Sequence, residues 1–455
     1  MDADAVVIGA GSTGLAVLRA LGANAVCVER GSDVGGLWRY ENDNGLSSAY
    51  ASLRTNVSRP RMQYPSFPMP ETFGDFPHHT DMAAYLGSYA DAFGLRERIR
   101  FGVTVERLEP LPEGGWLVTH GDRSELRARA AVVAVGHDWC PRLPEYPGGF
   151  DGEVLHAHDY RTPEPFAGRR LLVVGAGQSA AEIAVELSTH AAHTCLAIRS
   201  PVHVVPRRLD GAPYDTRDTW PANRLPWPLL NHLFARAAAR ELGPVPAQWP
   251  VPDRPLLEEL PTLSSELLPA VRRGAVAVRP GIERLDGQRV RFAGGREEEF
   301  DAIVYATGYR ISLPFLAPEL LQPEVRRLPL YRRIVPPGLD GLFLAGFVDA
   351  PSGLLPIVET QGDWIAAVLD GRLALPGAPA MRRAIDRSER RSRVRFPSEP
   401  PDSIRCDPHA YRRLLLADLR RARCRSWAYG RLPERAMRRK SRALGRARRA
   451  SVSGS

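Results

Sequence analysis

Two glycine-rich segments, each placed between strand-like and helix-like sequence, restrict the possible folds more than any other feature of the chain. The first occupies residues 9–14 (GAGSTG) after an apolar run, and the second occupies residues 175–180 (GAGQSA) after another. Each is followed by apolar residues at helical spacing and then by a second strand-like run. Two such strand–helix–strand units predict an α/β protein with two Rossmann-like dinucleotide-binding domains.

The first glycine set has the spacing of a phosphate-binding turn. Gly9 permits a tight turn, Gly11 lets backbone N–H groups approach a pyrophosphate, and Gly14 allows close packing of helix on strand. Glu29 ends the next strand-like run, where a carboxylate can accept hydrogen bonds from both hydroxyls of an unphosphorylated ribose. A structural turn without a ligand is the alternative interpretation.

The second set differs from the first at two informative places. Gly175 and Gly177 are retained, but Ala180 stands in place of the third glycine. The strand that follows ends in Arg199 instead of an acid, and an arginine there can pair with a 2′-phosphate and select NADP over NAD. The alternative is that Arg199 is a solvated strand-end cation. The two sets together indicate one FAD site and one NADPH site, with hydride passing from nicotinamide to flavin.

Two further apolar runs indicate how the domains are connected. Residues 132–136 precede the second unit and residues 302–308 follow it, and both runs end in glycine. The chain is therefore expected to leave the first domain, build the second and return. The expected division is an FAD-binding domain at 1–162 and 305–430, an inserted NADPH-binding domain at 163–304 whose segment 201–265 walls a pocket, and a basic, disordered C-terminal tail at 431–455.

Composition excludes several other classes of protein. Hydrophobic residues make up 44% of the chain and charged residues 25%, as in ordinary globular proteins. No run of 18 apolar residues is present, so no membrane span is expected. The five cysteines form no CxxC pair and the histidines recur at no ligand spacing, so we expect no metal site and no redox dithiol. Scattered cysteines suit a cytoplasmic location.

Charge is distributed unevenly along the chain. From Met381 onward, 22 arginines and Lys440 stand against seven acids, although the whole chain carries a net charge of only +9. Such a tail could bind nucleic acid or anionic lipid. Because no aromatic residues are interleaved with the arginines in a recognisable motif, a solvated tail is the favoured interpretation, and nucleic acid is not an expected partner.

The segment between the two units carries a recognisable signature. Phe150, Gly152, His156 and Tyr160 meet every fixed position of the pattern FxGxxxHxxx(Y/F). In this respect the chain resembles the flavin-containing monooxygenases. The related Baeyer–Villiger monooxygenases have tryptophan at the last position, which Tyr160 does not satisfy.

Other stretches extend the resemblance over roughly residues 1–370. They include residues 35–38 (GGLW), 53–56 (LRTN), 306–309 (ATGY) and 359–361 (ETQ). The resemblance implies that Asn56 lies near the reactive edge of the flavin and holds the peroxide or NADP⁺, whereas an Asx turn is the structural alternative. It also implies that His156 braces the domain junction. The remaining expected cofactor-binding residues are Gly36, Trp38, Ser179, Thr307, Gly308 and Gln361.

The activity implied by the resemblance is oxygenation of a nucleophilic nitrogen or sulfur atom of a small molecule. Reduced FAD would react with O₂ to form a C4a-hydroperoxyflavin, and the protein would exclude water and retain NADP⁺. Ketone oxidation of the Baeyer–Villiger type is the first alternative. A non-catalytic nucleotide-sensing or nucleic-acid-binding protein on the same fold is a distant one, and a homodimer is possible.

Overall fold

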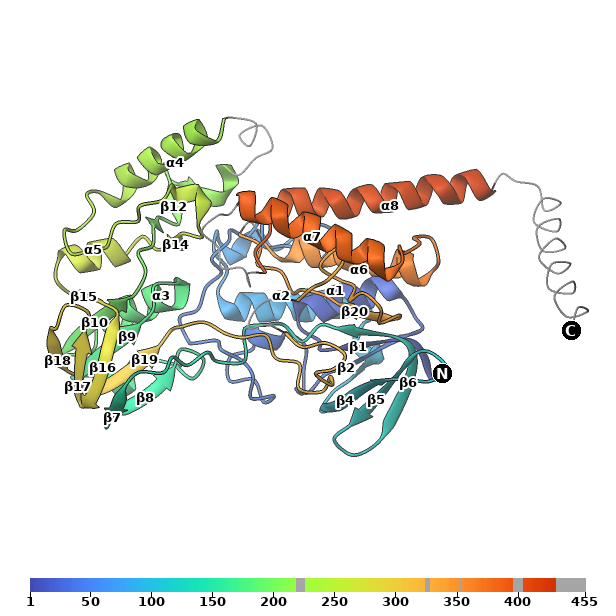
Figure 1. Cartoon of the computed structure of the whole chain (residues 1–455), viewed down its shortest axis with the longest axis horizontal. Helices are drawn as coiled ribbons and strands as arrows, with labels where there is room; N and C mark the ends of the chain where they lie inside the picture. The colour runs from blue at the N-terminus through green and yellow to red at the C-terminus, as the bar shows by residue number, and fades with distance from the viewer. Residues whose placement is uncertain (218–225, 324–327, 352, 396–403, 431–455) are drawn as a thin grey trace, which may run out of the picture.

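Two α/β lobes lie side by side in the computed structural model, which describes residues 1–217, 226–323, 328–351, 353–395 and 404–430 (Figure 1). One lobe contains β1 and β2 near the N-terminus, and the other contains β9, β10 and β19. The tail at 431–455, which was expected to be disordered, lies outside the described residues.

The first sheet joins a parallel part to an antiparallel part through one long strand. Its order is β3-β2-β1-β6-β5-β4, with β20 pairing β6. The long strand β6 pairs in parallel with β1 and β20 over its second half and antiparallel with β5 over its first half. The strands are β1 (Ala3–Ile8), β2 (Ala25–Val28), β3 (Ile99–Arg100), β4 (Val105–Pro110), β5 (Trp116–His120), β6 (Glu125–Val133) and β20 (Leu342–Leu344).

Helices from both ends of the sequence cover this sheet. Helix α1 (Ser12–Leu21) packs on α6 (Leu355–Leu369), so segments from both ends of the described chain lie in one lobe. Gly362 makes the packing close, because an added Cβ there would lie 2.9 Å from the carbonyl oxygen of Ala16. Helix α2 (His79–Ala92) begins with a capping box formed by His78 and Asp81, which satisfies backbone N–H groups of its first turn.

The second sheet is entirely parallel, with the order β15-β10-β9-β19-β8. Its strands are β8 (Glu153–His156), β9 (Arg170–Val174), β10 (His193–Ile198), β15 (Ala277–Pro280) and β19 (Ala302–Tyr305), and α3 (Gln178–Leu187) and α5 (Leu267–Arg272) pack beside them. A smaller sheet, β18-β17-β16-β7, lies alongside and comprises β7 (Gly148–Phe150), β16 (Ile282–Gly287), β17 (Arg289–Phe292) and β18 (Glu297–Glu299).

The expected domain boundary at residue 163 does not coincide with the edge of this sheet. Strand β8 pairs with β19 in the register His156↔Tyr305, and β7 pairs with β16. Both strands precede residue 163, yet their backbone hydrogen bonds go to the second lobe. By their backbone pairing, residues from Gly148 to His156 thus belong with the second lobe.

The inserted segment forms a small unit with its own core. It contains β11 (Val204–Val205), β12 (Arg208–Leu209), β13 (Ala212–Pro213), η5 (Tyr214–Arg217), α4 (Trp227–Leu242) and β14 (Thr262–Leu263). The core includes Val205, Leu209 and Leu256. Its one long helix is α4, and residues 218–225 are outside the described part of the chain.

Two long arginine-rich helices complete the molecule. They are α7 (Ala378–Arg395) and α8 (Pro408–Gly430), and α8 packs on α6 (Figure 1). Among the described residues, no helix combines the length and apolarity needed to cross a membrane.

Candidate functional site

A cavity of about 570 Å³ opens at the carboxyl ends of the parallel strands of the first sheet. Ile8, Val28 and Ala134, at or just beyond the ends of β1, β2 and β6, form part of its wall. Ligands of open α/β sheets bind at this edge. The second lobe reaches the same cavity through Ser179 at the start of α3.

The first glycine turn forms one end of the cavity. Gly9 has a φ of +102°, and an added Cβ would lie 2.9 Å from the carbonyl oxygen of Ala134. A Cβ on Gly14 would overlap the carbonyl oxygen of Gly9, whereas one on Gly11 would meet only the Cα of Gly36, at 3.8 Å. Gly9 and Gly14 are therefore glycines because of packing, and Gly11 leaves the wall of the cavity open. Helix α1 begins here without a side-chain cap, so N–H groups of its first turn remain available to an anion.

Glu29 lies buried in the cavity wall with its carboxylate held by the backbone. Its Oε2 accepts a hydrogen bond from the N–H of Ala10 at 2.6 Å, and its Oε1 accepts one from the N–H of Gly31 at 2.8 Å. Each carboxylate oxygen has a further lone pair, so the group can still accept hydrogen bonds from two ribose hydroxyls. The residues present thus fit FAD. Glu29 can accept hydrogen bonds from the ribose of its adenosine, and the open turn at Gly11 leaves room for its phosphates.

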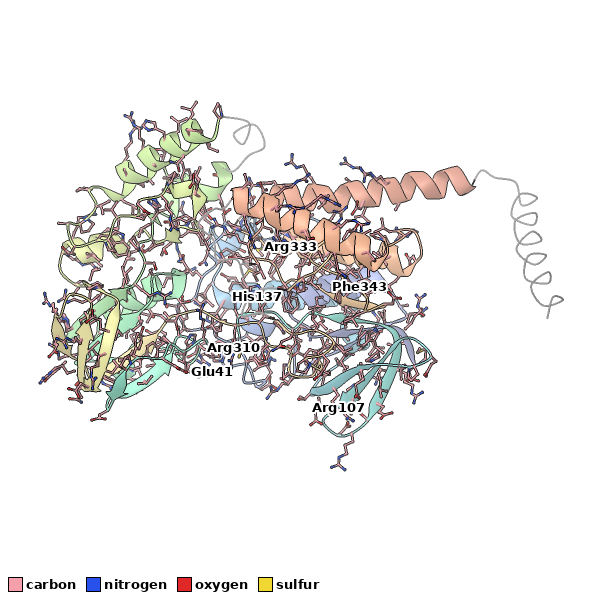
Figure 2. All side chains as sticks on the ribbon, viewed as in Figure 1. Glu41, Arg107, His137, Arg310, Arg333 and Phe343 are labelled. Atoms are coloured by element: carbon pink, nitrogen blue, oxygen red, sulfur yellow. The ribbon has the colours of Figure 1, made fainter. Side chains whose placement is uncertain are left out.

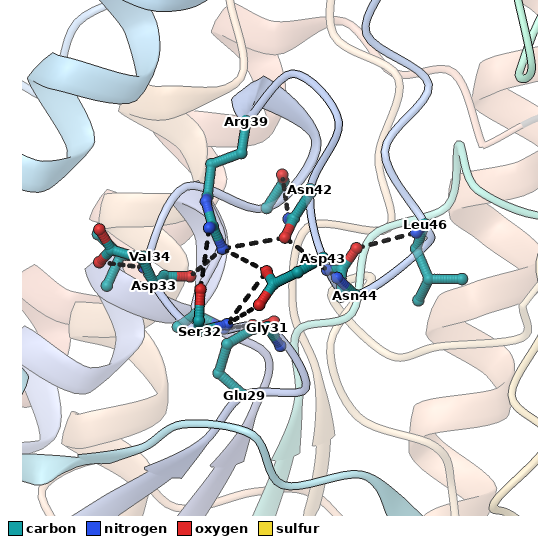
Figure 3. A network of polar contacts seen from close by, with 12 residues as sticks. Glu29, Gly31, Ser32, Asp33, Val34, Arg39, Asn42, Asp43, Asn44 and Leu46 are labelled. Atoms are coloured by element: carbon teal, nitrogen blue, oxygen red, sulfur yellow. Dashed lines mark hydrogen bonds and ion pairs between the residues drawn. The ribbon is translucent and has the colours of Figure 1, made fainter.

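A polar network holds the loop that carries Gly36 and Trp38, both of which line the cavity (Figure 3). The guanidinium of Arg39 donates to Asn42 Oδ1 at 2.9 Å and to Asp43 Oδ1 at 3.0 Å. Asn42 in turn donates from Nδ2 to the carbonyl oxygen of Gly36 at 2.9 Å. These side-chain hydrogen bonds therefore help to set the shape of the loop.

The second glycine turn has the same construction. Gly175 has a φ of +143°, and an added Cβ would overlap the carbonyl oxygen of Ala306. No atom lies within 4 Å of a Cβ placed on Gly177, so this backbone is also open to a phosphate. Helix α3 starts without a side-chain cap, and Ala180, which stands in place of the third glycine, is fully buried.

The three arginines after β10 differ in what they contact. Arg207 is ion-paired with Glu182, and Arg208 Nη2 lies 2.5 Å from Asp75 Oδ2. Arg199 is exposed and has no carboxylate partner in the described part of the chain. Of the three, Arg199 is therefore the one whose guanidinium is free to bind a 2′-phosphate.

Asn56 lines the cavity from the loop that follows Leu53. Its side chain is half-buried and forms no hydrogen bond with any described residue. An Asx turn requires a bond from this side chain to the backbone two residues later, and Ser58 N–H instead donates to Asp215. The amide is therefore available to a molecule in the cavity.

The signature residues His156 and Tyr160 lie behind the cavity and not in its wall. His156 is buried, its Nδ1 accepts a hydrogen bond from the N–H of His158 at 3.0 Å, and its ring stands edge-on to Tyr309 at 5.2 Å. Burial lowers the pKa of His156 to about 4. Tyr160 donates to Glu186 Oε2 at 2.8 Å on α3. Tyr309 does line the cavity, so His156 contributes to the shape of the cavity through its ring contact with Tyr309.

Three other residues that were expected to bind a cofactor do not line the cavity. Thr307 Oγ1 donates to the carbonyl oxygen of Arg142 at 2.5 Å, and the carbonyl oxygen of Gly308 accepts from the N–H of Arg142 at 3.0 Å. Gln361 is fully buried, and its Oε1 accepts from the N–H of Gly346 at 2.9 Å. Gly346 lines the cavity, so Gln361 shapes the wall without reaching the ligand space.

Several lining residues were not singled out from the sequence. His137, near the centre of the molecule (Figure 2), follows β6, and Asp349 follows β20. Tyr50 lines the cavity from an irregular segment and bonds Glu182 of the second lobe. His137 and Asp349 could have been found from the rule that parallel strands present their next residues to the ligand, whereas Tyr50 has no such signal.

Comparison with known proteins agrees with this geometry. Residues 3–414 match the family model described as flavin-binding monooxygenase-like. Dimethylaniline monooxygenase (N-oxide-forming) 2 of Mus musculus is 34% identical over 417 residues, which cover 85% of this chain and 77% of that protein. The structure of S-allyl-L-cysteine S-oxygenase from Allium sativum has a TM-score of 0.68 and 25% identity, covering 91% of this chain and 88% of the other.

A further structural neighbour shares the fold at lower identity. Cyclohexanone monooxygenase from Rhodococcus sp. Phi1, bound to NADP⁺, has a TM-score of 0.69 and 18% identity, covering 92% of this chain and 97% of the other. The resemblance inferred from the sequence motifs and the two-Rossmann fold are thus confirmed. The chain belongs to the flavin-binding monooxygenase-like family and is an oxidoreductase that uses FAD and NADPH.

Proposed function

We propose that this monooxygenase transfers one oxygen atom of O₂ to a nucleophilic nitrogen or sulfur atom of a small molecule. The observation that carries the proposal is that the first glycine turn, Ser179 at the start of α3 in the second lobe, and the unpartnered amide of Asn56 all line one cavity. Hydride transfer and oxygen transfer both need their partners enclosed together, and a shared cavity meets that need. The relatives named for N-oxide formation and S-oxygenation support the same class of substrate atom.

We propose the following division of the binding residues. FAD is held by Gly9, Gly11, Gly14, Glu29, Gly36 and Trp38. NADPH is held by Gly175, Gly177, Ser179 and Arg199. His156, Thr307, Gly308 and Gln361 position the segments around the two cofactors, because each bonds backbone that lies next to the cavity or to the domain junction. The NADPH-binding domain starts at β7 on this assignment.

Each part of the site has a separate chemical task. FAD, when bound, accepts hydride from NADPH and supplies the reactivity toward O₂. Glu29 orients the adenosine, and the N-terminus of α1 places backbone N–H groups at the phosphates. Asn56 donates a hydrogen bond from a neutral amide, which cannot release a proton to the reacting oxygen as an acid would.

The test is NADPH consumption with product identification. Purified enzyme is supplied with a tertiary amine, a dialkyl sulfide and a cyclic ketone in separate reactions under isotope-labelled O₂. We expect N-oxide or sulfoxide carrying one labelled oxygen atom, formed in proportion to the NADPH oxidised. Conversion of the ketone alone to a labelled ester would instead establish Baeyer–Villiger oxidation, and NADPH oxidation without labelled product from any compound would contradict the proposal.

A further inference from the structure

Asp215, in the inserted segment of the second lobe, reaches across to the loop that carries Asn56. It lies on η5 (Tyr214–Arg217), and its Oδ2 accepts a hydrogen bond from the N–H of Ser58 at 2.7 Å. Ser58 is two residues after Asn56, and residues 54, 56 and 57 all line the cavity. The bond joins positions 157 residues apart in the sequence, so it exists only when the two lobes are docked.

The neighbour of Asp215 makes a second contact on the opposite wall. Tyr214 donates from its hydroxyl to the carbonyl oxygen of Pro351 at 3.3 Å. Asp349 and Ala350, just before Pro351, line the cavity. The backbone N–H of Tyr214 donates to the carbonyl oxygen of Arg207 at 3.0 Å, which ties the short helix back to its own lobe. One turn of the inserted segment therefore contacts two separate loops of the FAD-binding lobe.

Burial makes this carboxylate costly to keep. The Asp215 side chain belongs to a residue that is only 1% exposed, and Oδ1 has no hydrogen-bond partner among the described residues. Oδ1 is thus buried without a hydrogen bond, which lowers stability, while the nearby charge of Arg61 favours the ionised carboxylate. Burial raises the pKa of Asp215, in keeping with this cost. A core residue chosen for stability alone would be apolar here, so the acceptor at Oδ2 has to serve the loop.

We propose that Asp215 is a positioning residue for oxygen transfer. By fixing the backbone at Ser58, it holds the Asn56 amide in the cavity and makes that placement depend on the inserted segment. The inserted segment then affects oxygen transfer through the hydrogen bond between Asp215 and the backbone of the loop that carries Asn56. The proposal rests on the function proposed for Asn56.

The experiment compares Asp215→Ala with Asp215→Asn in the full-length FAD-loaded enzyme, using the best amine or sulfide found. Asparagine keeps an oxygen that can accept from Ser58 N–H, and alanine does not. Asp253→Ala, which removes an exposed acid from the same inserted segment, is the control. The measured quantities are hydrogen peroxide released per NADPH, the anaerobic rate of flavin reduction, the melting temperature, and hydrogen exchange of the amides at 54–58.

We expect Asp215→Ala to raise the peroxide released per NADPH by about tenfold, since a hydrogen bond to a charged group is lost. Its flavin reduction rate should stay within about twofold of the parent, because hydride transfer does not use Asn56. The amides at 54–58 should exchange faster, and Asp215→Asn and Asp253→Ala should resemble the parent. A purely structural role would instead lower the melting temperature and slow reduction and oxygenation together.

An unchanged peroxide ratio and unchanged exchange in Asp215→Ala would overturn the inference. If that variant does not retain FAD, the Ser58 amide in the parent enzyme still decides the matter: slow exchange supports the bond to Asp215, and exchange at the rate of an open loop overturns it. Asn56→Asp is measured in parallel. Should it uncouple the enzyme while Asp215→Ala does not, the positioning role fails and the role of Asn56 stands.

Discussion

The two glycine turns share one construction but differ at the residue that follows the second strand of each unit. In the first, Glu29 is buried and two backbone N–H groups hold its carboxylate. In the second, Arg199 is exposed at the end of β10 and has no carboxylate partner in the part of the chain that the structure describes. The first site is thus preorganised by the fold, whereas the second presents a solvated cation.

This difference matches the different tasks of the two cofactors. FAD stays with the enzyme through the catalytic cycle, so a buried and prearranged acceptor reduces the entropy that binding costs. NADPH must arrive and NADP⁺ must leave in every turnover, and an exposed guanidinium can attract the phosphate without a large desolvation cost. We infer that specificity in the first site comes from shape and in the second from charge.

The largest effect is expected from the third position of the first turn. In Gly14→Ala the added methyl group would overlap the carbonyl oxygen of Gly9, so the helix and the turn must separate. We expect a loss of at least about 3 kcal/mol of stability and little retained FAD. The matched change in the second turn, Ala180→Gly, should cost only about 1 kcal/mol and leave the FAD content unchanged. The FAD content per chain and the thermal unfolding of both variants are measured. Equal losses of FAD and of stability in Gly14→Ala and Ala180→Gly would show that the third positions of the two turns do not differ in packing.

Arg199→Ala should act on one coenzyme only. Loss of a charge-assisted contact to phosphate costs about 1.5–3 kcal/mol, so the apparent KM for NADPH should rise about tenfold or more while that for NADH stays nearly constant. Arg207→Ala is the control, because this arginine is already ion-paired with Glu182 and should change stability more than coenzyme choice. Equal weakening of both coenzymes in Arg199→Ala would mean that Arg199 is structural.

The smallest effect concerns the junction between the two sites. Burial lowers the pKa of His156 to about 4 from its ordinary value of 6.5. Between these two pH values, His156 is protonated in the unfolded chain and neutral in the folded protein. Stability is then unaffected above about pH 7 and falls as the pH drops from 6.5 toward 4, by about 2 kcal/mol from this residue once pH 5 is reached.

The matched variant for this junction is His156→Asn, which keeps an acceptor for the N–H of His158 and cannot titrate. Unfolding free energies at pH 7 and pH 5 should therefore differ less in the variant than in the parent. If both lose the same stability, His156 is not a neutral buried group.

The two glycine turns and the strand–helix–strand units around them could be predicted from the sequence, because each depends on local spacing. The cofactor roles of Glu29 and Arg199 stay predictions. The sequence did not predict that β7 and β8 join the second lobe, since strand pairing is set by the sheet edge and not by local pattern. The contacts of Asp215 with Ser58 and of Gln361 with Gly346 also left no local signal. Such contacts join distant segments, and only the folded chain brings them together.

Asn56→Asp tests whether the amide of Asn56 supports oxygen transfer but not flavin reduction. An ionised carboxylate cannot donate the hydrogen bond that the amide offers to the cavity. The measurement is the amount of oxygenated product formed per NADPH consumed, with anaerobic flavin reduction followed in the same preparation. We expect flavin reduction within about twofold of the parental rate and a product yield at least about tenfold lower, with hydrogen peroxide released instead. An unchanged product yield would show that Asn56 has no part in oxygen transfer.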